Sequence, residues 1–163
     1  MRQVFFSFHY NRDVWRASMV RNMGKVDNSS TFSDNDWEEV RFKSDARIKA
    51  WIDEQMAMRP CIVVLVGQEI SERKWVKYEI EQAMKLHKGI VGIRIHNLEN
   101  QYREQDDAGS NPFYNVIAPS GHRLSNYVTL YDPGYVTSRY VYNDIRDNIE
   151  RLIEDAISNR LSY

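Results

Sequence analysis

An uninterrupted apolar run at residues 61–66 (CIVVLV) is the feature that most constrains the fold. Apolar and polar residues do not alternate in it, which is typical of a strand that is covered on both faces. Such strands belong to parallel sheets with helices on both sides. A second buried run follows at residues 90–95 (IVGIRI), after a helical segment. The sequence therefore predicts an α/β protein with a central parallel sheet.

The other elements follow from apolar periodicity and capping residues. A short aromatic strand is predicted at the start of the chain, and one helix stripe carries Ile145, Ile149 and Leu152. Asn11 or Asp13 can cap the first helix, and Ser71 can cap the one after the apolar run. We expect one domain over residues 1–163, a doubly wound sheet of four or five strands. The predicted strands are 4–8, 61–66, 90–95 and 127–131, the predicted helices are 11–23, 44–58, 72–87 and 143–158, and residues 24–36 leave room only for a short edge strand.

In such sheets the ligand crevice lies beyond the carboxyl ends of the strands. Residues 9–13, the turn at 67–75 and the loop after residue 95 are expected to meet there. Residues 97–126 form a long polar stretch rich in Asn, Asp, Gly and Ser. Loops of this length in compact domains are usually lids or binding loops, or else disordered.

Composition argues against several partners. The formal net charge is −1, so no basic field favours nucleic acid or an anionic membrane. No apolar run approaches the roughly 20 residues that span a bilayer, and no signal peptide is recognisable. Cys61, the single cysteine, is expected to be a buried reduced thiol. A cytoplasmic protein without nucleic-acid or membrane partners is the expectation.

Glu79 is the candidate catalytic residue. Glu81 has lysines at both i−4 and i+4, and Glu72 lies in the first turn of its predicted helix, where it complements the helix dipole. Glu79 instead lies at the edge of the apolar stripe and has no cation at the neighbouring positions of its own helix. Such a carboxylate either pairs with a distant arginine, which is the structural interpretation, or binds a ligand.

The neighbours of Glu79 suit a flat cationic ring that is attached to a sugar. Trp75 lies one turn before it, and Trp75 or Tyr78 can stack on a planar ring. Nicotinamide leaves NAD as a neutral molecule, so this cleavage needs no general acid. One carboxylate that holds the ribose hydroxyls and stabilises the oxocarbenium-like transition state is sufficient. Water or a nucleophile within ADP-ribose then attacks, depending on how well the site excludes water.

Four segments together resemble a known family. They are residues 4–10 (VFFSFHY), 75–80 (WVKYEI), 92–96 (GIRIH) and 111–113 (NPF). The first two are similar to the first strand and the glutamate-bearing helix of TIR domains. All four resemble the bacterial TIR-like family that includes the TIR subunit of Thoeris anti-phage defence. The resemblance covers about residues 3–115, and the segment at about 26–40 shows no clear match.

The resemblance implies a three-layer flavodoxin-like fold and cleavage of NAD, which is a substrate here and not a cofactor. It implies a cyclic or modified ADP-ribose product that activates a separate effector protein. Carried over by position, Glu79 is catalytic and Trp75 stacks on the nucleotide, while Phe8 and His9 line the nucleotide site. Asn111 lies in the loop over the cleft. A homo-oligomer is compatible with the family, but the unmatched segment leaves open whether neighbouring subunits share an active site.

Two other functions stay open: a non-catalytic TIR-type adaptor, in which Glu79 is structural, and a nucleoside (deoxy)ribosyltransferase. A flavodoxin is disfavoured because residues 9–13 (HYNRD) contain no Ser/Thr-rich phosphate loop. A receiver domain is disfavoured because no strand ends in a phosphorylatable aspartate. We expect no metal, since the four histidines lack ligand spacing and the acidic run at 34–39 lacks the pattern of a calcium loop.

Overall fold

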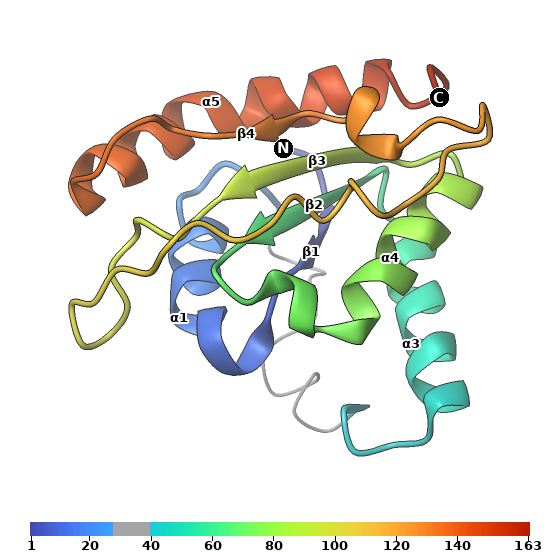
Figure 1. Ribbon diagram of the computed structural model, residues 1–163, viewed down its shortest axis with the longest axis horizontal. Helices are drawn as coiled ribbons and strands as arrows, with labels where there is room; N and C mark the ends of the chain where they lie inside the picture. The colour runs from blue at the N-terminus through green and yellow to red at the C-terminus, as the bar shows by residue number, and fades with distance from the viewer. Residues whose placement is uncertain (28–39) are drawn as a thin grey trace.

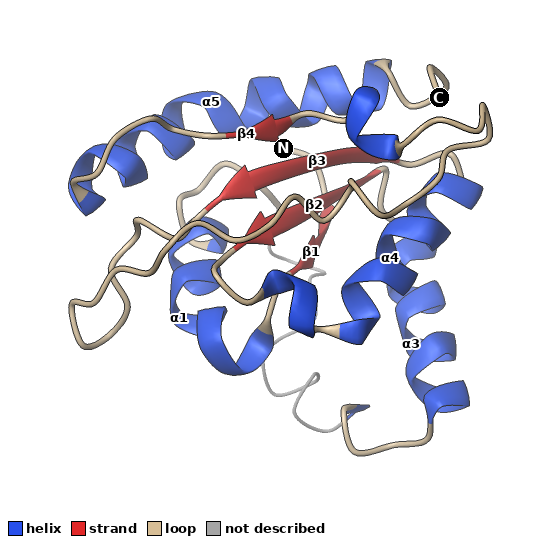
Figure 2. Cartoon of the chain, in the orientation of Figure 1, coloured by secondary structure: helices blue, strands red, loops and turns tan. Residues whose placement is uncertain are grey.

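The computed structural model describes residues 1–27 and 40–163. In these residues four parallel strands form one sheet in the order β1-β2-β3-β4 (Figures 1 and 2). The strands are β1 (Val4–Ser7), β2 (Cys61–Val66), β3 (Gly89–Arg94) and β4 (Leu130–Tyr131). The predicted parallel α/β sheet is confirmed. The last strand is shorter than predicted, and the acidic run at 34–39 and most of the proposed edge-strand segment lie outside the described residues.

Helices cover both faces of the sheet, which gives the expected three layers. Successive strand side chains point to opposite faces, so Val63 and Leu65 of β2 enter one core while Ile62 and Val64 enter the other. The first core is covered by α1 (Tyr10–Arg21) and α5 (Ser138–Ser158), and the second by α3 (Asp45–Ala57) and α4 (Lys74–Lys85).

The first helix begins earlier than predicted. His9 is its N-cap, and the His9 Nδ1 atom accepts a hydrogen bond from the Arg12 backbone N–H at 3.3 Å. Asn11 and Asp13 are therefore inside α1 and not caps. Asp13 is instead completely buried, with its carboxylate 3.0 Å from the Arg16 guanidinium.

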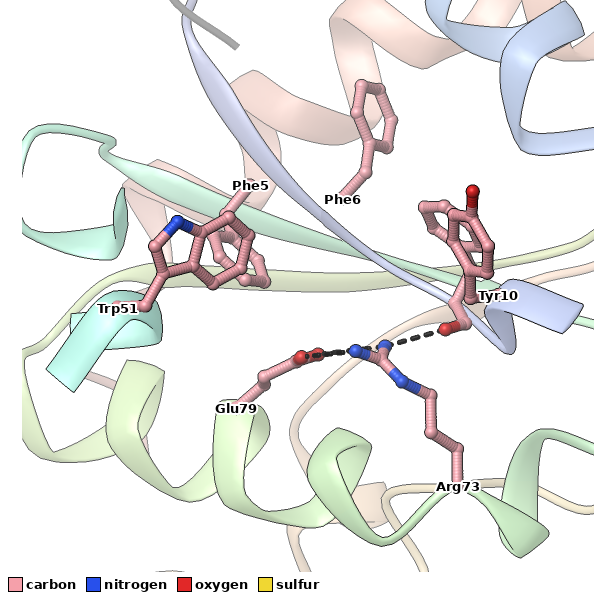
Figure 3. A pocket seen from close by; sticks show the side chains of 7 residues that line it. Phe5, Phe6, Tyr10, Trp51, Arg73 and Glu79 are labelled. Atoms are coloured by element: carbon pink, nitrogen blue, oxygen red, sulfur yellow. Dashed lines mark hydrogen bonds and ion pairs between the residues drawn. The ribbon is translucent and has the colours of Figure 1, made fainter. Parts of the chain in front are cut away.

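The helix predicted for residues 72–87 is broken near its start. A 3-10 helix η1 (Ile70–Glu72) comes first, and α4 begins at Lys74, so Ser71 does not cap it. Between them Arg73 has extended backbone angles, φ −90° and ψ 104°. This break lets the Arg73 side chain point toward Glu79 of α4, as Figure 3 shows.

The long segment after β3 closes the carboxyl edge of the sheet. Arg12 of α1 binds Asp106 at 2.9 Å, and the Asp107 backbone N–H donates to the Gln68 side chain at 2.8 Å. The three segments expected at this edge therefore do meet there. A Cβ atom on Gly109 would overlap the Gly67 carbonyl oxygen, so the segment lies directly on the end of β2.

The same segment also contributes to the core. Phe113, Val116 and Leu124 are buried in the cluster that α3 and α4 cover, and a short 3-10 helix η2 (Leu124–Asn126) precedes β4. None of the described helices is long and apolar enough to cross a bilayer.

Candidate active site

An aromatic hollow at the end of β1 ends on the carboxylate of Glu79 (Figure 3). Its volume is only about 10 Å³, which is about the space of one water molecule. The walls come from β1, α1, α3 and the start of α4. The lining residues are Phe5, Phe6, Phe8, Tyr10, Trp51, Arg73 and Glu79.

Glu79 lies at the bottom of this hollow with two hydrogen-bonding partners. The Ser7 hydroxyl on β1 donates to Glu79 Oε2. Arg73 Nη2 donates to Glu79 Oε1 at 2.9 Å, and Arg73 Nη1 lies 3.4 Å from Oε2. Arg73 Nη1 also donates to the Phe8 carbonyl oxygen at 2.6 Å. The carboxylate is therefore held from one side by the sheet and from the other by a guanidinium.

Glu79 is buried more deeply than its place at the edge of the apolar stripe predicts, since only 1% of it is exposed. It pairs with an arginine, as the structural interpretation expects, although this arginine, Arg73, is only six positions earlier. The helical wheel did not find this partner because Arg73 is not helical and reaches Glu79 from the N-terminal end of α4.

Burial decides the protonation balance of the pair. It raises the pKa of Glu79, although Arg73 and the Ser7 hydroxyl oppose that rise. Burial also lowers the pKa of Arg73, against the attraction of Glu79. Both pKa shifts favour the neutral forms of the two groups. Keeping Glu79 and Arg73 ionised in this buried site therefore costs free energy. A buried carboxylate of this kind interacts strongly with any positive charge that replaces the guanidinium.

The structure brings some of the sequence-predicted site residues together. Phe8 and Glu79 line the hollow. His9, which follows Phe8 and caps α1, is not among the lining residues of the hollow. Trp75 and Tyr78 do not line it. Their rings contact each other edge to face, with centroids 5.8 Å apart, and Tyr78 donates to Asp53 at 2.9 Å. Their substrate-binding roles stay predictions.

Asn111 lies in the segment over the carboxyl edge and does not line the hollow either. Its Oδ1 atom accepts the Phe113 backbone N–H at 2.9 Å, so it stabilises the turn that inserts Phe113 into the core. A role in nucleotide binding stays a prediction for this residue as well.

Sequence reasoning missed four residues of the site. Trp51 of α3 is the indole that lines the hollow. Tyr10 lines it from the first turn of α1. Ser7 gave a signal, because it is the polar residue of an otherwise apolar strand. Arg73 gave none, since its position depends on the break between η1 and α4.

A possible metal-binding group lies beside the site. Within the described chain, ligand atoms of His9, Glu69 and Glu72 lie within 4.8 Å of one another. Spacing along the chain could not reveal this group. However, His9 Nδ1 accepts the capping N–H of Arg12, so the neutral ring carries its proton on Nε2. Glu69 also faces Arg12 at 3.4 Å. These two interactions oppose metal binding here.

Comparison with known proteins identifies the family of the chain. Residues 5–100 match the family described as "Thoeris protein ThsB, TIR-like domain". Over 117 residues, 69% of this chain, the sequence is 32% identical to ThsB1 of Bacillus cereus (strain MSX-D12), a candidate cyclic ADP-D-ribose synthase by its name. The match covers 61% of the length of that relative. Ser7, Trp51, Arg73 and Glu79 all lie in the span that matches the family.

Proposed function

Because this chain belongs to the TIR-like domain family of Thoeris protein ThsB, we propose that it cleaves NAD and makes a cyclic or otherwise modified ADP-ribose. The name of its relative ThsB1 supports an ADP-ribose product that is cyclised. The observation that carries the proposal is the buried Glu79 carboxylate at the bottom of an aromatic hollow.

The proposed reaction breaks the bond between the ribose C1′ atom and the pyridinium nitrogen. The bonding electrons go to the ring, which leaves as neutral nicotinamide, and positive charge develops on the ribose. Glu79 stabilises that charge and accepts hydrogen bonds from ribose hydroxyls. Trp51 and Tyr10 provide aromatic surface for the planar ring.

The fate of the ribosyl cation depends on water. Attack by water gives ADP-ribose, whereas attack by a nitrogen of the adenine within the same molecule closes a ring. The walls of the hollow are mainly aromatic. A substrate packed between such walls is shielded from water, and this disfavours hydrolysis. The lining therefore supports an intramolecular nucleophile and a cyclic product.

Two partner relations are part of the same proposal. The nucleotide product would act on a separate effector protein during anti-phage defence, in keeping with the family's place in Thoeris. A cytoplasmic homo-oligomer is the form that we expect. One observation supports the adaptor alternative: Glu79 forms an ion pair with Arg73, as a purely structural glutamate would.

Product analysis tests the proposal. NAD is incubated with the purified protein, and in parallel with lysate from phage-infected cells that express it, and products are resolved by mass spectrometry. We expect free nicotinamide together with a product one water lighter than ADP-ribose, or a modified ADP-ribose, and none of these with Glu79→Gln. If neither sample contains nicotinamide that depends on Glu79, the protein is not this enzyme and the adaptor interpretation is favoured.

A further inference from the structure

Arg73 occupies the place at Glu79 that a cationic substrate would need. Its guanidinium is planar and positively charged, and it contacts both the Glu79 carboxylate and the Phe8 carbonyl oxygen. With this side chain in place the hollow has about 10 Å³ of space, which admits a water molecule but no pyridine ring. The structure is therefore a closed form of the site.

We propose that Arg73 is an autoinhibitory latch, an internal cation that must leave Glu79 before NAD can bind. The inference rests on the proposed function and adds a means of regulating substrate binding. A pyridinium and a guanidinium are both flat cations with delocalised charge. A pyridinium beside Glu79 would be repelled by the Arg73 guanidinium, and the hollow has no space for the ring while Arg73 is in place.

The position of Arg73 in the chain allows it to move. It is the extended residue between η1 and α4, with φ −90° and ψ 104°, so it belongs to neither helix. Its guanidinium forms an ion pair with Glu79, and the backbone on its two sides is held by η1 and α4. A rotation of the side chain, or a shift of η1, opens the hollow without unfolding α4.

The groups that Arg73 would release match the substrate. When the Arg73 side chain leaves the hollow, it exposes two hydrogen-bond acceptors, the Glu79 carboxylate and the Phe8 carbonyl oxygen. Ribose hydroxyls and the nicotinamide amide group are donors that can replace the guanidinium. Ser7 stays behind on β1 and keeps Glu79 oriented. The closed form thus satisfies with one side chain the same acceptors that substrate would satisfy.

Binding of a cation that cannot be cleaved tests the latch separately from catalysis. The probe is 1-methylnicotinamide, with neutral nicotinamide as the charge control, titrated by calorimetry into wild type, Arg73→Gln, Arg73→Ala and Arg73→Lys. We expect both uncharged replacements to lower the Kd of 1-methylnicotinamide at least tenfold. The neutral ring should gain less, and Arg73→Lys should stay within about threefold of wild type.

Lys77→Ala is the matched control, since it removes an exposed cation of the same helix that pairs with Glu81 at 3.9 Å. It should bind the probe as wild type does. Arg73→Gln keeps the polar character of the side chain and an amide donor, so it disturbs the fold less than Arg73→Ala. Circular dichroism confirms folding of each variant before titration. If Arg73→Gln and Arg73→Ala bind 1-methylnicotinamide no better than wild type, Arg73 is not a latch.

A second measurement on the wild type covers the case in which variants fail to fold. The guanidinium protons of Arg73 are followed by NMR at saturating 1-methylnicotinamide. The latch predicts faster exchange with water when the probe binds, and unchanged exchange contradicts it. Nicotinamide release from NAD is measured in parallel. Tighter probe binding by the Arg73 variants, with no nicotinamide release by the purified protein or in lysate from phage-infected cells, would reject the proposed function and keep the latch. Nicotinamide release without tighter probe binding would keep the proposed function and reject the latch.

Discussion

Ser7 of β1 donates a hydrogen bond to Glu79 of α4, a residue 72 positions later in the sequence. Both residues are buried, with exposed fractions of 0% and 1%. The sheet edge and the helix that covers it are thereby joined at one carboxylate. The bond fixes the direction in which Glu79 faces the hollow, and it stabilises the ionised form that the proposed chemistry needs.

Ser7→Ala should lower kcat for nicotinamide release by about tenfold to a hundredfold, since a hydrogen bond to a charged group contributes about 1.5–3 kcal/mol. The Ser7 hydroxyl lowers the pKa of Glu79, so its loss should also move the acidic limb of the kcat profile to higher pH. Ser162→Ala, which removes an exposed hydroxyl near the C-terminus, is the control. An unchanged pH profile would show that Ser7 only supports the fold.

Trp51→Ala should raise the KM for NAD about tenfold, because an aromatic ring that stacks on a base contributes about 1–3 kcal/mol. Trp51 lines the hollow, whereas Trp75 packs on Tyr78 outside it. The sequence predicts that Trp75→Ala also weakens NAD binding more than it destabilises the fold. Steady-state kinetics and melting temperatures of both variants compare the two indoles. If Trp75→Ala raises KM more than Trp51→Ala does, Trp75 is the residue that stacks on NAD.

Stability should depend on pH through Glu79. Its ordinary pKa is 4.5, and burial raises the pKa in the folded state. The folded protein therefore holds this proton more tightly than the unfolded chain does, and the free energy of unfolding falls as the pH rises through the window above 4.5. Urea unfolding of wild type and Glu79→Gln between pH 4 and 8 measures the difference. The free energy of unfolding of wild type relative to the variant should fall as the pH rises in this window. If this difference rises instead, the effect of Arg73 on the pKa of Glu79 is larger than the effect of burial.

Gly109→Ala should destabilise the protein by about 1–3 kcal/mol, the usual cost of overpacking. The added Cβ would overlap the Gly67 carbonyl oxygen, which is backbone and cannot rotate away. Ser110→Ala is the control, because Ser110 is exposed beside it. Hydrogen exchange of the Asp107 amide, which binds Gln68, reports the detachment of the segment. Equal exchange in both variants would mean that this segment is not held on the end of β2.

The fold was predictable where one local signal dominates. The run from Cys61 to Val66 is a central strand because nothing polar interrupts it. The break at Arg73 was not predictable. Ser71 is a good cap by residue type, but residues 70–72 form a 3-10 helix that packs Ile70 into the core. Tertiary packing overrides the capping preference there.

The site was predictable in part for a similar reason. Glu79 could be identified because its own helix provides no cation at i±3 or i±4. Trp51 and Ser7 come from α3 and β1, so only the assembled layers bring them to Glu79. Trp75 is near Glu79 along the helix surface, yet its ring turns to Tyr78. Adjacency on a helical wheel does not fix the direction of a side chain.

Turnover of NAD by Glu79→Gln, with Glu81→Gln as its matched control, tests the central claim most directly. Both residues are on α4, but Glu81 is partly exposed and faces Lys77, whereas Glu79 is buried in the hollow. Nicotinamide release is measured in variants shown to be folded. The account predicts that Glu79→Gln loses release and that Glu81→Gln keeps the wild-type rate. Release by Glu79→Gln at the wild-type rate would contradict it.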